Sequence, residues 1–153
     1  MDAGIGIKTK KLHLWAGTGD LMNLNDVLVD KTKVKNVMFG IKDSHFPFFG
    51  HVNTPQTADT LQECKNVPTD GTENCPDLSD AGWYVELDDR KKITAEPTMR
   101  GNAVYFPIYK PTTGSKSCGA GNAYICALNA DCGTNLSAQL GSNTGAEAGE
   151  ECY

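Results

Sequence analysis

Apolar and polar positions along this chain form short runs rather than the long stripes of amphipathic helices. Runs of aromatic, β-branched and apolar residues are bounded by Gly, Pro, Asn or Asp, which is the pattern of β-strands. Strands that follow one another with short turns and no helix between them indicate antiparallel meanders, and only residues 55–64 offer a turn with helical character. The predicted strands span residues 11–16, 34–42, 83–87, 93–99, 103–109 and 122–128.

Three residues in or beside these strands carry a specific structural expectation. Gly17 and Gly19 at the end of the first strand mark a turn or a close approach of two backbones. They are no dinucleotide-binding fingerprint, because Met22 stands where the third glycine is needed. Pro97 has no N–H to donate, so its strand is expected to be bulged, or to lie at an edge or facing a channel.

The strand pattern breaks between residues 44 and 80, a long connection for a compact domain. We interpret this segment as an inserted surface loop that contains a Cys64–Cys75 disulfide and does any binding work of the chain. The predicted organisation is therefore most of one meander in residues 1–90, with the inserted loop at residues 44–80, and most of a second meander in residues 91–153. The second ends in an acidic tail rich in Gly, Asn and Ala.

Size and charge restrict the classes of protein to which this chain can belong. The chain has 153 residues, 39% of them hydrophobic, which suits a globular fold with a core. Its net charge of −5 argues against nucleic-acid binding, and no segment reaches the ~20 apolar residues of a membrane span. Residues 1–4 begin without the features of a signal peptide, and residues 150–153 end on a cysteine and a tyrosine, so both ends of the chain are expected to be cut from something longer.

Six cysteines occur without any C-x-x-C pair, which disfavours a zinc ribbon or a thioredoxin-like site. An even count at irregular loop spacing predicts disulfides, and hence the periplasm, the cell surface or the outside of the cell. Cys118 with Cys132 would flank one predicted strand, but spacing alone does not fix the pairing. The disulfide candidates are Cys64, Cys75, Cys118, Cys126, Cys132 and Cys152.

Candidate chemistry is sparse. Oxygen ligands crowd into one short loop, where calcium is conceivable although the spacing fits no EF-hand and such residues also form ordinary turns. His13, His45 and His51 fit no metal or catalytic pattern and are interpreted as packing or surface residues, and no nucleophile elbow or P-loop occurs. We therefore expect no enzyme and no catalytic residue. The oxygen ligands of the weak metal candidate are Asp20, Asn23, Asn25 and Asp26.

Three aromatic residues stand in an irregular stretch of the insert. Phe46, Phe48 and Phe49 either pack over an exposed face of a sheet or form a contact surface. They are the binding-loop candidates of the chain.

Two parts of this layout resemble the C-terminal β-propeller of the PilY family, adhesins associated with the tips of bacterial type IV pili. The first part reads Trp-Ala-Gly-Thr-Gly-Asp in residues 15–20 and, after a variable loop, Met-Phe-Gly-Ile-Lys-Asp in residues 38–43. The second begins at Gly82-Trp83 and is similar to the family's run of Gly-Trp, Leu, Pro, Phe, Pro, Cys, Gly and a final Ala-Leu-Asp, with Asn129 in place of that Asp. The family's calcium-loop sequence has no match.

The resemblance implies about two blades of a propeller, each a four-stranded antiparallel meander, with the insert outside it. It implies a role in surface attachment and pilus assembly, at the cell surface or pilus tip after export through the periplasm. The partners would be the remaining blades or a partner subunit, and minor pilins. Two alternatives stay open: part of a quinone-dependent propeller dehydrogenase, which Ala127-Leu128-Asn129 before Cys132-Gly133 distantly resembles, or a small secreted disulfide-bonded interaction subunit.

Overall fold

The computed structural model describes residues 1–19, 35–43, 45–47, 62–63, 80–87, 91–111 and 121–136. Within these ranges the secondary structure consists of strands and turns without helix, so the all-β prediction is confirmed there. Across the same ranges no helix is long and apolar enough to cross a membrane.

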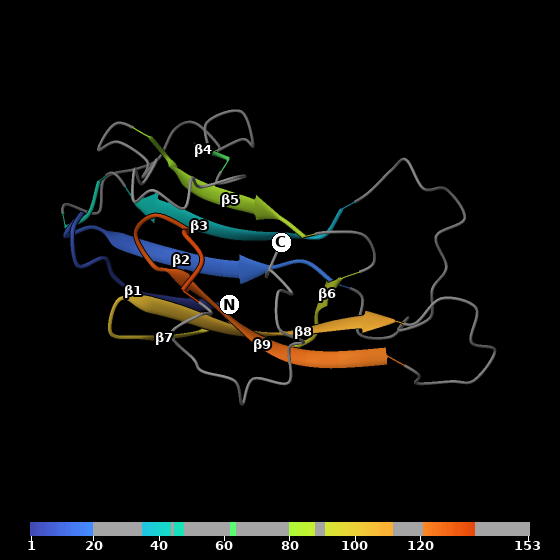
Figure 1. Ribbon diagram of the computed structural model, residues 1–153. Helices are drawn as coiled ribbons and strands as arrows, with labels where there is room; N and C mark the ends of the chain where they lie inside the picture. Colours follow the sequence, from blue (N-terminus) through green and yellow to red (C-terminus); the bar gives the residue numbers. More distant parts are fainter. Residues whose placement is uncertain are drawn as a thin grey trace, which may run out of the picture.

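Sheet A contains five strands in the order β1-β2-β3-β5-β4 (Figure 1). Strands β1, β2, β3 and β5 pair with one another antiparallel and in chain order, as the meander prediction requires. β4 then pairs with β5 in the parallel direction. The strands are β1 (Asp2–Ile5), β2 (Leu12–Gly17), β3 (Val37–Asp43), β4 (Gln62–Glu63) and β5 (Gly82–Glu86).

Sheet B is built on the long hairpin of β8 (Ala103–Pro111) and β9 (Gly121–Asn129). These two strands pair over their whole length, so β6 (Lys92–Ile93) and β7 (Thr98–Arg100) share the other edge of β8. The single strand expected over residues 93–99 is thus divided in two. Pro97 lies in the interruption at an edge of the sheet, as expected of a residue that cannot donate to a ladder.

Three expectations need correction. β1 was not predicted, although its four residues form an edge of sheet A. The segment 44–80 was expected to be loop, with a helical turn near residues 55–64, but Gln62–Glu63 form strand β4. The tail after residue 133 was also expected to be loop, whereas Asn135 bridges to Leu128 and so begins to pair with β9.

The predicted close approach at Gly17 and Gly19 is confirmed. A Cβ at Gly17 would lie 2.4 Å from the Cδ1 atom of Ile93, and one at Gly19 would lie 2.4 Å from the carbonyl oxygen of Ile93. The Ile93 N–H donates to the Thr18 carbonyl at 3.4 Å. Two glycines without side chains therefore let the end of β2 in sheet A meet β6 in sheet B.

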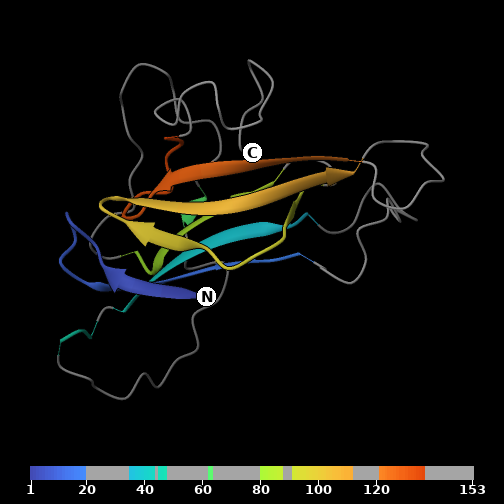
Figure 2. The ribbon, with the colours of Figure 1, turned by 90° about the horizontal axis from the view of Figure 1, so that it is seen from below.

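The core lies between the two sheets, which face each other as layers (Figure 2). Alternate residues of each strand point into it, as the period of a strand dictates. Sheet A contributes two tryptophans that are fully buried, one on either side of Gly40 in the strand register. The core consists of Trp15, Met38, Trp83, Val85, Leu87, Ile93, Val104, Phe106, Ile108, Tyr124, Cys126, Leu128 and Ala130.

Two isoleucines on the β8–β9 hairpin provide a matched test of this core. Ile108 is completely buried, whereas Ile125 is 51% exposed on the opposite face of sheet B. We expect Ile108→Ala to lower the free energy of unfolding by about 2–5 kcal/mol, because it removes buried methyl groups and leaves a cavity. Ile125→Ala should cost about 1 kcal/mol or less. Urea denaturation measures both, and equal losses would contradict the assignment of the two faces.

Candidate functional site

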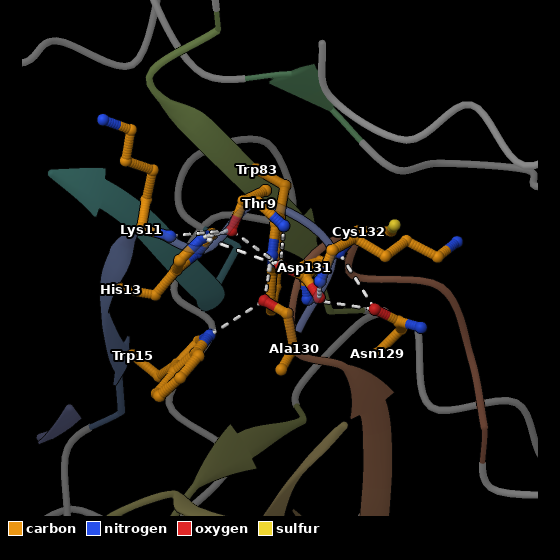
Figure 3. Close-up of polar contacts among 10 residues, drawn as sticks. Thr9, Lys11, His13, Trp15, Trp83, Asn129, Ala130, Asp131 and Cys132 are labelled. Carbon is orange, nitrogen blue, oxygen red and sulfur yellow. Dashed lines mark hydrogen bonds and ion pairs between the residues drawn. The ribbon is translucent and has the colours of Figure 1, made fainter. Parts of the chain in front are cut away.

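The densest group of polar contacts lies at the turn after β9, where residues 129–133 form what we call the corner turn (Figure 3). The Asn129 side-chain oxygen accepts hydrogen bonds from the N–H groups of Asp131 (3.0 Å) and Cys132 (3.2 Å). The Gly133 N–H closes the turn on the Asn129 carbonyl at 2.7 Å. An amide oxygen thus caps the turn.

Gly133 satisfies two requirements of the corner turn. Its φ of 71° lies in the left-handed region that favours glycine. A Cβ there would also lie 2.6 Å from the Cε3 atom of Trp83. The backbone conformation and the packing on the indole therefore both require the absence of a side chain.

Both core tryptophans hold the next residue of the turn. The Ala130 carbonyl oxygen accepts the indole N–H of Trp15 at 3.2 Å and that of Trp83 at 3.0 Å (Figure 3). The Ala130 N–H donates in turn to the Asn102 carbonyl at 2.7 Å. One peptide of sheet B thereby satisfies two buried donors from sheet A, and buried donors need such partners.

Asp131 binds the turn between β1 and β2 through hydrogen bonds. Its carboxylate accepts the N–H of Lys8 at 3.0 Å, the N–H of Thr9 at 3.3 Å and the Thr9 hydroxyl at 2.9 Å. Burial alone would raise the pKa of Asp131, but these hydrogen bonds, together with nearby His13, hold that pKa below its ordinary value. A buried carboxylate is thus kept ionised by a loop more than a hundred residues away in sequence.

His13 lies beside this carboxylate, almost completely buried and stacked on Trp15 with 5.8 Å between ring centroids. Its Nε2 atom is 2.9 Å from the Thr9 hydroxyl oxygen and 3.9 Å from Asp131 Oδ1. Burial lowers the pKa of His13, Asp131 opposes that effect, and the charge of Lys42 adds to it. The packing interpretation of His13 agrees with this environment.

The corner turn is a structural joint rather than a reaction centre. The Asp131 carboxylate is occupied by three donors, and its low pKa makes it a poor general base. Among the described residues no group of three or more His, Cys, Asp or Glu side chains could hold a metal ion. What this arrangement can do is fix the β1–β2 turn and both sheets relative to one another.

The sites expected from the sequence fall mostly elsewhere. Phe46 is half-buried, and its carbonyl accepts the Lys11 ammonium at 2.8 Å. Cys126 and Cys132 are buried and are both disulfide-bonded, while the pairing of the six cysteines stays a prediction. The remaining candidates lie outside the described residues: Asp20, Asn23, Asn25, Asp26, Phe48, Phe49, Cys64, Cys75, Cys118 and Cys152.

Thr9 and Asp131 were missed from the sequence. Each is an ordinary turn residue in its own segment, and only the fold brings them together. The available signal was an aspartate two residues after Asn129, at the end of an apolar strand.

No protein-family model, curated protein or solved structure matches this chain.

Two glycines test the corner turn. Gly133→Ala combines a strained φ with a clash against Trp83, so we expect a loss of about 2–5 kcal/mol in the free energy of unfolding. Gly101 has a similar φ of 64°, yet a Cβ added there would meet no atom within 4 Å, so Gly101→Ala should cost only about 1 kcal/mol. Thermal unfolding of both variants separates packing from strain, and equal losses would refute the role given to Trp83.

Replacement of the Asp131 carboxylate tests its hydrogen bonds to the β1–β2 turn. Asp131→Asn weakens three hydrogen bonds to a charged acceptor, and we expect a loss of about 2 kcal/mol at pH 7. Because the pKa of Asp131 is lower in the folded protein, its stabilisation is complete above the ordinary value of 3.8 and is lost as the pH falls through the folded value. The difference from wild type should therefore shrink below pH 3.8 in urea titrations. A gap that is independent of pH would contradict this account.

Proposed function

We propose that this chain is a non-enzymatic, blade-forming segment of an adhesin associated with type IV pili. The observation that carries the proposal is the outward face of sheet A, whose central rows of side chains are apolar. An antiparallel sheet with one face in water alternates apolar and polar residues, whereas a sheet covered on both faces has apolar residues throughout. Sheets covered on both faces are what a propeller contains.

The outward residues of sheet A form rows across its strands. Leu14 pairs with Ala3 on one side and Ile41 on the other, and Phe39 pairs with Ala16 and Tyr84. Two of the large apolar side chains that stand exposed among the described residues lie on this face, Ile5 at 42% and Leu14 at 36%. Exposed apolar groups gathered on one face indicate an interaction surface.

Sheet B has a similar outward face on its central hairpin. Tyr105, Pro107 and Tyr109 of β8 pair in register with Ala127, Ile125 and Ala123 of β9. None of these six side chains is charged, and Ile125 is half-exposed. Each sheet of the pair therefore offers a second apolar face on which a further sheet can pack, as blades do around a ring.

The motifs that resemble the PilY family occupy structural positions that support the proposal. The Gly-Thr-Gly segment makes the contact between the two sheets at Ile93, and the Gly-Trp segment places the indole that reaches Ala130. Asn129, which stands in place of the family's aspartate, caps the corner turn. Disulfide-bonded Cys126 and Cys132 support an exported protein at the cell surface.

In this proposal the described sheets are scaffold, and the insert with Phe46, Phe48 and Phe49 displays the binding loop. The partners are the remaining blades, which cover the outward faces, and pilus components such as minor pilins. The proposal requires no cofactor. The weak candidate for a calcium site remains the loop of Asp20, Asn23, Asn25 and Asp26.

A double substitution on the outward face tests both parts of the proposal. Ile5→Thr with Leu14→Thr keeps strand propensity but removes the apolar surface. In the isolated chain both side chains are partly in water, so the free energy of unfolding should change by about 1 kcal/mol or less. In the full-length protein the same change should cost about 2–4 kcal/mol, because each side chain is then buried against the next sheet.

Two readouts separate the propeller from the pilus role. The matched control is Ile7→Thr, which is exposed in the turn and outside the strand rows. If the full-length protein tolerates the double variant as well as the isolated chain does, the stacked-blade arrangement is wrong. The second readout is the fraction of piliated cells in electron micrographs, together with the number of cells that attach in adhesion assays. If the stability of the full-length protein falls but both quantities stay normal, the propeller arrangement is supported and the pilus role is refuted.

A further inference from the structure

The turn between β1 and β2 is held in a way that makes it sensitive to acid. The Gly6 N–H and the Lys11 carbonyl close the turn at 2.9 Å. Its anchor to sheet B is the Asp131 carboxylate, which accepts the N–H groups of Lys8 and Thr9. Among the described strands β1 pairs with β2 alone, so β1 and the turn that follows it lie at the edge of sheet A.

The hydrogen-bond directions fix the tautomer of His13. Thr9 has one hydroxyl proton, which it donates to Asp131 Oδ1. The same hydroxyl can then only accept at its 2.9 Å contact with His13, so the proton of the neutral ring is on Nε2. Nδ1 is consequently a bare acceptor, and it is buried without a hydrogen-bond partner among the described residues.

We infer that His13 and Thr9 form an acid-sensitive latch with Asp131: protonation of His13 releases the β1–β2 turn from the corner turn while the two sheets stay packed. A second proton must enter at Nδ1, where it finds no acceptor among the described residues. The ring would then be a cation in a buried site, stacked on Trp15 and beside the buried Lys42, its register partner on β3.

Once His13 is protonated, the groups that face its ring favour release of the β1–β2 turn from Asp131. Lys42 on β3 repels the protonated ring, and Asp131 on the corner turn attracts it across 3.9 Å. The β1–β2 turn contributes Thr9, whose hydroxyl proton already belongs to Asp131. Burial outweighs the attraction, so the closed form has a His13 pKa below the ordinary value of 6.5, whereas opening exposes the ring to water.

The sign of the pH effect follows. A histidine with a lowered pKa stabilises the closed latch fully above pH 6.5. That stabilisation declines as the pH falls below 6.5 and levels off below the pKa of the closed form. Opening takes up one proton in this interval, so the open population rises by up to about tenfold per pH unit.

Amide hydrogen exchange of the whole 153-residue chain tests the latch. The amides of Lys8 and Thr9, which donate to Asp131, should lose protection by up to about tenfold between pH 6.5 and 5.5, after correction for intrinsic exchange rates. The amides of Val104 and Phe106 in the core strand β8 should keep theirs. Unchanged protection of Lys8 and Thr9, or an equal loss in β8, would overturn the inference.

Matched variants identify the titrating group. His13→Gln stays neutral and can still donate an amide hydrogen to Thr9, so protection of Lys8 should not vary with pH. His45→Gln is the control, since His45 is half-exposed and lies outside the latch. A pH response that survives in His13→Gln would assign the effect to another group and refute the latch.

Two measurements keep the test decisive if His13→Gln does not fold. The ring resonances of His13 in the wild-type chain should titrate with a pKa below 6.5, and a value at or above 6.5 excludes the mechanism. Thr9→Ser keeps the bridging hydroxyl and should behave as wild type, whereas Thr9→Val should lower the protection of Lys8 even at a pH of about 7.5, where His13 is neutral. Equal behaviour of these two variants would also overturn the inference.

Discussion

The structure depends on one carbonyl group, that of Ala130, which accepts hydrogen bonds from both core tryptophans. The indoles come from β2 and β5 of sheet A, and the carbonyl belongs to the turn that ends sheet B. Burial of two tryptophans supplies most of the energy, roughly 4–6 kcal/mol each at the usual value per unit of apolar area. The two hydrogen bonds are smaller terms, but losing their acceptor would strand two buried donors at about 1–3 kcal/mol each. Burial therefore drives the contact, and the carbonyl decides its geometry.

Three consecutive residues of the corner turn divide the work of joining the sheets. Asn129 shapes the turn, Ala130 receives the indoles, and Asp131 holds the β1–β2 turn. Gly133 lets the turn lie against Trp83 without a side chain in between. One short segment therefore contacts both sheets and the β1–β2 turn.

Most strands could be predicted because their signal is local. The alternation of β2 and β3, and the placement of Pro97 at an edge of its sheet, depend on residues that are neighbours in sequence. The close approach at Gly17 was equally predictable, since two glycines in three residues at a strand end mark such a position. β1 escaped notice because four residues with a glycine among them carry little strand signal, and its pairing with β2 supplies the rest. The joint between the sheets could not be predicted, because Thr9 and Asp131 are 122 residues apart and neither has an unusual local context. Local pattern thus identifies the elements, while the contact that positions them depends on the tertiary fold.

The positions of His13 and Asp131 explain why acid should act on the β1–β2 turn. Lys91 lies over the ring of Tyr124, near the far end of β9 from the corner turn. His13 and Asp131, which change charge in acid, are both at the corner turn. Between these ends the described core is made of apolar side chains that acid leaves unchanged. Acid can therefore loosen the β1–β2 turn while the tryptophans keep their hold on Ala130, and the apolar outward faces remain available for further sheets.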